Sequence, residues 1–433
     1  MSRAVKERDS ATGTRDSEVG REHALKPSGE STRPASLDSR PGPDASPGAA
    51  RLWLRGLGPL VLLALLVFAF LRVGPVGVFR AGFPPVEELT IQRVSFPEPN
   101  RMRVDVVNGG PEPVTVAQLF VDDASWVHTI DGARTIERLG TRTINVPYPW
   151  VEGEPHTVTL VTSTGLTFSH DVAVATRTPA PNARYLGTFA LLGLYVGVIP
   201  VFLGLLWLPF LRAIPRKWVD FFLSLTIGLL VFLGVDAIAE ALELSARVAG
   251  AFQGLGLVLL GALGTPLLLA ALGNRRSRTA GGRTPLYVAM LIALGIGLHN
   301  LGEGLLIGAS YATGEIALGT FLVIGFLLHN TTEGLGIVAP LAGERVSTRS
   351  LVLLGALAGV PTILGAWLGG FTYSPVWTTL FFAIGAGAIA QVVYELWRLF
   401  ARRGEAGLTS PLNAGGLVAG LVLMWLTGLV VAA

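Results

Sequence analysis

The chain of 433 residues has no cysteine and only four methionines. Disulfide bonds, thiolate zinc sites and iron–sulfur clusters are therefore excluded, and the scarcity of thioether groups argues against a path for Cu(I). Charged residues are also scarce, at 15% of the chain, and the net charge of +3 is too small to indicate a nucleic-acid partner. Any metal site must therefore use nitrogen and oxygen ligands.

Hydrophobic residues and glycine are abundant instead, at 51% of the chain and 54 positions respectively. This is the composition of a polytopic membrane protein, in which small residues let helix backbones approach closely. We predict a helical transport domain over residues 185–433. Its eight apolar spans are 185–211, 218–244, 250–273, 285–312, 316–341, 350–371, 376–397 and 412–432.

The loops between these spans carry their basic residues on alternate sides. Twelve Lys or Arg lie in one set of loops, whereas the opposite short loops hold only Arg247. Because basic loops stay in the cytoplasm, this asymmetry predicts a cytoplasmic N-terminus and an extracytoplasmic C-terminus. Compact loops and the lack of cysteine favour the plasma (inner) membrane of a bacterium or archaeon.

Three further regions are predicted before the transport domain. Residues 1–55 are rich in Arg, Ser and Pro and are expected to form a disordered cytoplasmic tail. Residues 56–79 contain the apolar run Leu57–Leu71 and are interpreted as an uncleaved membrane anchor, a ninth span. An atypical cleaved signal peptide is the alternative.

Residues 80–178 are predicted to form an extracytoplasmic β-sandwich of immunoglobulin-like type. Near period-2 alternation marks five strands, at 89–96, 101–107, 113–121, 156–162 and 166–174. Turn residues such as those at 108–111 separate them. The three histidines of this region, His128, His156 and His170, are interpreted as surface or loop residues rather than metal ligands.

Two copies of the hexad His-Asn-x-x-Glu-Gly, at 299–304 and 329–334, lie inside apolar spans. Each places its His and Glu at i and i+4, on one face of a helix, and each is centred near the fifteenth residue of its span. The two spans run in opposite directions, so both motifs are expected at the same depth in the membrane. Neither span holds a Lys or Arg to pair with the carboxylates.

A carboxylate buried in lipid must be protonated or matched by a cation. A bound divalent metal would neutralise the buried carboxylates of both hexads. Imidazole, carboxylate and amide ligands suit Zn(II), Fe(II), Mn(II) or Co(II) better than Ca(II). The alternative is a polar cluster between helices that binds no metal. The predicted metal ligands are His299, Asn300, Glu303, His329, Asn330 and Glu333.

Two other pairs of polar residues stand at i and i+4 within spans. Asp236 and Glu240 are expected to face the bundle in its outer half, and Gln391 and Glu395 lie close to the cytoplasmic end. Each pair is a candidate relay into or out of the metal site. Polar residues at a helix end are the alternative for both.

The hexads resemble the signature helices of the ZIP (Zrt/Irt-like) family of divalent metal transporters, whose pattern is His-Asn-x-Pro-Glu-Gly. The resemblance extends over residues 185–433 and includes Gly334–Leu341. It implies an eight-helix ZIP-like bundle. It also implies a primary site of His299, Glu303, His329 and Glu333, with Asn300 and Asn330 at an adjacent second metal position. Asp236 and Glu240 fall where members often read His-x-x-Pro-Glu-Ala.

The sequence departs from this pattern at identifiable places. Gly302 and Thr332 stand where both motif prolines are expected, and the span 350–371 contains no carboxylate. Because some members supply a ligand to the second metal from that helix, one metal site is the firmer prediction. The anchor and the β region lie outside the resemblance.

The predicted function is transport, not catalysis: a divalent metal (Zn, Fe, Mn, Co or Cd, with zinc the leading candidate) moves from outside into the cytoplasm. No prosthetic group is expected. The predicted partners are the metal ion and the lipid bilayer, with a homodimer left open. One alternative is a metal sensor that signals through the outer β domain. Another is an intramembrane metallohydrolase, although no His-Glu-x-x-His motif occurs.

Overall fold

The computed structural model of the chain describes residues 49–73, 86–279, 284–401 and 407–432. It divides into two compact units, residues 1–83 and 84–433. The described part of the first unit is the helix α1 (Ala49–Val73). Its apolar stretch, Leu57–Phe70, is shorter than the helices long enough to cross a membrane, so the anchor at 56–79 stays a prediction. The predicted tail lies almost wholly outside the described residues.

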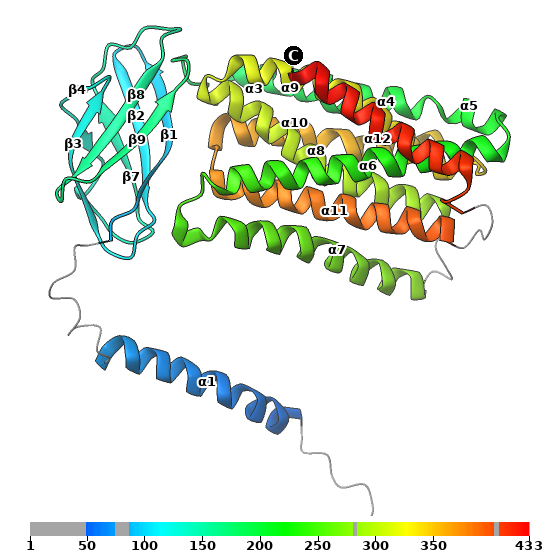
Figure 1. Ribbon diagram of the computed structural model, residues 1–433, viewed down its shortest axis with the longest axis horizontal. Coiled ribbons are helices and arrows are strands. Elements are labelled where there is room, and N and C mark those ends of the chain that lie inside the picture. The colour runs from blue at the N-terminus through cyan, green and yellow to red at the C-terminus, as the bar shows by residue number, and fades with distance from the viewer. Residues whose placement is uncertain (1–48, 74–85, 280–283, 402–406, 433) are drawn as a thin grey trace, which may run out of the picture. The chain divides into compact units, whose positions relative to one another are not determined.

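The second unit begins with two antiparallel sheets that pack face to face as a β-sandwich (Figure 1). One sheet has the order β1 (Leu89–Glu98), β2 (Arg101–Asn108), β7 (Thr141–Val146) and β5 (Thr129–Ile130). The other has the order β4 (Ala124–Ser125), β3 (Val114–Val121), β8 (His156–Thr162) and β9 (Thr167–Val172), with β6 (Thr135–Ile136) paired to β3. All five predicted strands are present.

The core of the sandwich follows from alternation along these strands. Val104 and Val106 of β2 face Val158 and Leu160 of β8 within one apolar cluster, and all four are fully buried. Side chains two residues apart lie on the same face of a strand, so the alternating pattern predicts this core correctly. Strand β7 escaped prediction because Arg142 occupies the inward parity ahead of Ile144 and Val146, which masks the apolar alternation.

His156 is not a surface residue, contrary to the sequence interpretation. Only 5% of it is exposed, and its Nδ1 lies 2.8 Å from Oδ2 of Asp122. The same oxygen accepts a hydrogen bond from the Tyr148 hydroxyl, and Oδ1 of Asp122 accepts one from the Thr157 N–H. Partial burial alone would raise the pKa of Asp122, but these hydrogen bonds together hold it below its ordinary value.

A lowered carboxyl pKa makes the sandwich sensitive to acid. Asp122 stabilises the folded state above its unfolded pKa, and this stabilisation is lost as the pH falls through the folded pKa. We expect Asp122→Asn to speed amide hydrogen exchange in β3 and β8 at neutral pH. The difference from wild type should shrink as the pH falls from about 3.9 through the lower folded pKa of Asp122, below which both chains carry an uncharged side chain. An increase in amide hydrogen exchange that is the same at neutral pH and at the acidic pH would contradict this account. Asp123→Asn, on the same turn, is the matched control.

The rest of the described chain forms a bundle in which eight helices are long and apolar enough to cross a membrane, as predicted. The first span, 183–213, consists of α3 (Ala183–Gly193), the π-helix η1 (Leu194–Val198), α4 (Ile199–Leu205) and α5 (Leu208–Ala213). The others are built on α6 (Arg216–Ser245), α7 (Gly254–Thr279), α8 (Pro285–Thr313), α9 (Ile316–Val338), α10 (Thr348–Thr372), α11 (Pro375–Ala401) and α12 (Pro411–Ala432). Helices α8, α9 and α11 are the most enclosed, whereas α7 lies at the edge beside α11 (Figure 1).

A tight turn joins the two helices that carry the hexads. Helix α8 starts at a Thr284 cap, whose hydroxyl accepts the Tyr287 N–H, and it ends at Gly314. Gly314 has φ of +83°, a left-handed conformation that favours glycine. Its N–H bonds back to the Ser310 carbonyl, so that the chain reverses at once into α9. The hexads therefore lie on consecutive helices of opposite direction.

Glycines bring α8 and its neighbours into backbone contact. A Cβ on Gly304 would meet the Thr362 carbonyl of α10, and a Cβ on Gly334 would meet the Val201 carbonyl of α4. Close approach of this kind requires a residue without a side chain. The final glycine of each hexad therefore serves helix packing, and α8 continues unbroken through its hexad without the proline of the family pattern.

Candidate metal centre

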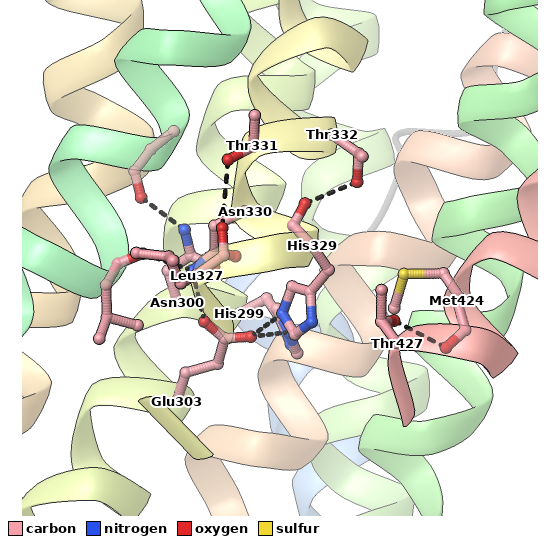
Figure 2. Close-up of polar contacts among 12 residues, drawn as sticks. His299, Asn300, Glu303, Leu327, His329, Asn330, Thr331, Thr332, Met424 and Thr427 are labelled. Carbon is pink, nitrogen blue, oxygen red and sulfur yellow. Dashed lines mark hydrogen bonds and ion pairs between the residues drawn. The ribbon is translucent and has the colours of Figure 1, made fainter. Parts of the chain in front are cut away.

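Three side chains converge in the centre of the bundle, one carboxylate between two imidazoles (Figure 2). Oε1 of Glu303 lies 3.1 Å from Nε2 of His299 and 2.5 Å from Nε2 of His329. One ligand atom from each residue lies within 4.8 Å of the others. The exposed fractions are 4%, 1% and 7% for His299, Glu303 and His329, so the cluster is shielded from solvent.

The helix geometry accounts for this convergence. His299 and Glu303 are one turn apart on α8 and share a face. His329 comes from α9, which the turn at Gly314 places antiparallel to α8. A single carboxylate oxygen thus faces imidazoles from both hexads, as the predicted common depth requires.

Asn330 holds the second oxygen of the carboxylate. Its Nδ2 donates to Oε2 of Glu303 at 3.0 Å and to the backbone carbonyl of Val196 at 3.0 Å. That carbonyl belongs to the π-helix η1. The residue four positions later is Pro200, which has no N–H to donate. Pro200 therefore removes one backbone donor that could compete with the Asn330 amide for this carbonyl.

Asn300 is fixed in a similar way by a neighbouring helix. Its Nδ2 donates to the carbonyl of Ala358 in α10 at 3.1 Å. The Oδ1 atoms of Asn300 and Asn330 are both buried and have no hydrogen-bond partner in the structure. Backbone carbonyls thus hold the nitrogen end of each amide and leave the oxygen end unpaired, the end that can bind a cation.

Glu333 is not one of the three clustered residues but lies near Glu303 and Asn300. It is buried, and neither carboxylate oxygen has a hydrogen bond of standard geometry, although the Asn300 amide is within reach. Beside it is a cavity of about 10 Å³, close to the volume that one water needs. The cavity is lined by Thr226, Leu229, Leu230, Leu233, Ile296, His329, Thr332, Glu333 and Met424. A carboxylate in such surroundings requires either a proton or a cation.

The two predicted relay pairs differ in how deeply they are buried. Gln391 donates to Glu395 through Nε2 at 3.0 Å, and both residues are buried in α11. Asp236 of α6 is exposed and Glu240 is half-buried. The expectation that both acids face the bundle interior is therefore wrong for Asp236. No hydrogen bond or ion pair in the described part of the chain joins Asp236 or Glu240 to the His–Glu cluster.

The sequence interpretation missed the backbone groups of the site, the carbonyls of Val196 and Ala358. For the first of these the sequence does hold a signal. A proline inside an apolar span always leaves one carbonyl without its helical donor. Pro200 therefore marks a carbonyl one turn earlier as an available acceptor. No comparable signal marks Ala358, because the residue four positions later has an N–H.

Chemically, the centre offers imidazole nitrogen, carboxylate oxygen and amide oxygen in a dry, preformed arrangement. It contains no cysteine, and its ligand types are those of borderline divalent metals. The family model described as "ZIP Zinc transporter" matches residues 273–392, a range that contains both hexads. This match confirms the resemblance drawn from the sequence. No curated protein matches the chain.

Proposed function

We propose that this chain, whose hexad-bearing region matches the ZIP zinc transporter family, carries divalent transition-metal ions across a membrane into the cytoplasm. Members of that family are metal transporters rather than enzymes. The observation that carries the proposal is the buried convergence of His299, Glu303 and His329 at the centre of an apolar bundle. Such groups are costly in lipid and mark ion pathways.

In this proposal His299, Glu303 and His329 bind the ion first, through the atoms that now meet at Oε1 of Glu303. The unpaired amide oxygens of Asn300 and Asn330 and the unpaired carboxylate of Glu333 complete the set. Mixed nitrogen and oxygen ligands suit zinc best and also accept iron, manganese, cobalt or cadmium. The ion is the transported substrate, not a resident cofactor.

An access route to the site is supported by a cavity of about 560 Å³ between the β-sandwich and the bundle. Its α8 wall includes Leu306 and Ser310. These residues follow Glu303 by three and seven positions and so lie on the same helix face. Leu306 is about 4.5 Å along the helix axis from Glu303. It is half-buried, and it packs against two apolar clusters, so we propose that it closes the path.

The direction of transport and the membrane rest on the loop charges. Twelve Lys or Arg on one side against Arg247 on the other support a cytoplasmic face at the start of α8 and an outer face at its end. The cavity at Leu306 then opens outward, and the β-sandwich is extracytoplasmic. We propose the plasma (inner) membrane as the location, with residues 56–79 as an additional anchor.

The test is metal flux into proteoliposomes that hold the full-length protein and a trapped zinc-sensitive dye. We expect dye signal to rise on external Zn²⁺, with a rate that saturates and with competition by Fe²⁺, Mn²⁺, Co²⁺ and Cd²⁺. A chain that binds Zn²⁺ at equilibrium but gives no more flux than empty liposomes would be a sensor, and the transport assignment would fail. Zn²⁺-dependent cleavage of lipid or peptide without flux would instead indicate a hydrolase.

A further inference from the structure

A second cavity, of about 760 Å³, is lined by residues of the strands β1, β2 and β7. The linker Thr178–Pro181 and the last residues of α10, Phe371 and Thr372, complete its wall. None of the residues of the metal centre lines this cavity. The strands and the linker that line it fall outside residues 273–392, the range of the family match. Its volume falls in the range of small-molecule sites.

Arg93 of β1 lines this cavity and has Asp105 of β2 as its cross-strand neighbour. The residue is half-buried, and its Nε and Nη2 atoms are buried without a hydrogen-bond acceptor. Burial lowers the pKa of the guanidinium, and Arg103 lowers it further, whereas Asp105 opposes both. Arginine nevertheless stays protonated in proteins. Buried N–H groups that lack an acceptor are unfavourable, and Asp105, although it is near, accepts no hydrogen bond from Arg93. The open donors of Arg93 can therefore accommodate a further anion.

The acids of the cavity are already engaged elsewhere. Oδ1 of Asp105 accepts from Nε of Arg103 at 3.2 Å and from the Thr143 hydroxyl at 2.7 Å. Oδ1 of Asp131 accepts from the Asn145 amide at 3.1 Å. Neither carboxylate makes a hydrogen bond to Arg93, which is therefore left with open donors.

The other two arginines of the cavity have their own acceptors. Arg103 also donates through Nη2 to the Thr143 hydroxyl at 3.2 Å. Arg142 donates to the carbonyls of Ala133 and Thr141, at 3.3 and 2.8 Å. Among the three guanidiniums that line the cavity, Arg93 alone has no described hydrogen bond.

We propose that Arg93 binds the carboxylate of a small organic anion in this cavity. A guanidinium presents two parallel N–H groups that match the two oxygens of a carboxylate. Three arginines against two aspartates leave one positive charge in the cavity wall, which matches a monoanion. A phosphate dianion would instead meet the carboxylates of Asp105 and Asp131 on the same wall, and like charges repel.

The test is isothermal titration calorimetry on the full-length protein in detergent micelles at low ionic strength. The probes are acetate, benzoate and inorganic phosphate. Benzoate should bind more tightly than acetate, because it fills more of the cavity, and phosphate should bind least. Arg93→Gln should raise the Kd for benzoate by about tenfold or more, the loss of one charge-assisted pair. Arg93→Lys keeps the charge without the planar fork and should raise it less.

Arg101→Gln is the matched control. Arg101 is a surface arginine on β2 that pairs with Glu98 and does not line the cavity, so its replacement should leave the Kd unchanged. The proposal is overturned if wild type shows no saturable binding of either carboxylate up to about 10 mM, if phosphate binds as tightly as benzoate, or if Arg93→Gln binds like wild type. Should Arg93→Gln fail to fold, Arg93→Lys provides the comparison.

Discussion

Replacing Glu303 by glutamine is expected to lower metal uptake by more than about a hundredfold, because loss of even an outer-shell partner of a metal site costs 10–100-fold. Glu303 contacts both histidines and Asn330. Glutamine keeps the size of the side chain but removes the negative charge, and its NH₂ group cannot accept a hydrogen bond or bind a metal. Flux into proteoliposomes and equilibrium Zn²⁺ binding should both fall.

Glu243→Gln is the control for this experiment. Glu243 is an exposed acid near the C-terminal end of α6. Its ion pair with Arg247, at 3.6 Å, is of the surface type that contributes little. Its replacement should leave uptake within about twofold of wild type. If Glu303→Gln transports Zn²⁺ at the rate of Glu243→Gln, then the ion does not pass through the His–Glu cluster.

Gly304→Ala is expected to destabilise the bundle by about 2–3 kcal/mol, the upper range for overpacking a tight interior. The new methyl group would lie against the Thr362 carbonyl and the Ala366 N–H of α10. These are backbone atoms, which cannot turn away as a flexible side chain would. Helix α8 must then move off α10, and Glu303 is the preceding residue. Thermal unfolding in detergent should begin at lower temperature, and zinc uptake should fall with it.

The neighbouring glycine offers a matched comparison. A Cβ on Gly302 would lie 3.6 Å from the ring of Phe382, an ordinary van der Waals distance. Gly302→Ala should therefore unfold at the temperature of wild type or above it, since alanine favours helix over glycine. Equal losses of stability from the two substitutions would show that the cost does not arise from contact with α10.

The bundle could be predicted because its signals are strong and local. Apolar runs of span length and clusters of basic residues are read directly from the chain, and all eight predicted spans coincide with helices of the structure. That the two hexads lie close together in space could be predicted from the sequence for the same reason. A fixed spacing within helices and a single reversal between two consecutive helices determine which face and which depth a residue reaches.

The parts that escaped prediction depend on contacts between distant segments. His156 is the first residue of β8 and has the sequence context of a surface residue. In the structure it is buried and hydrogen-bonded to Asp122, which lies 34 positions earlier in the chain. Asp236 shares its spacing with Glu240, yet the packing of α6 leaves Asp236 exposed. Arg142 interrupts the alternation that would have revealed β7. For His156 the deciding partner lies on another segment, which periodicity cannot identify. For Arg142 the strand itself breaks the alternation.

The hydrogen bond between Asn330 and the Val196 carbonyl has a thermodynamic consequence. One amide group bridges the first span of the bundle and the carboxylate of Glu303. The position of the η1 segment and the state of the central site are therefore linked equilibria. An ion that draws Glu303 toward itself must shift the population of η1 positions. By reciprocity, a shift of η1 alters the affinity for that ion by the same factor.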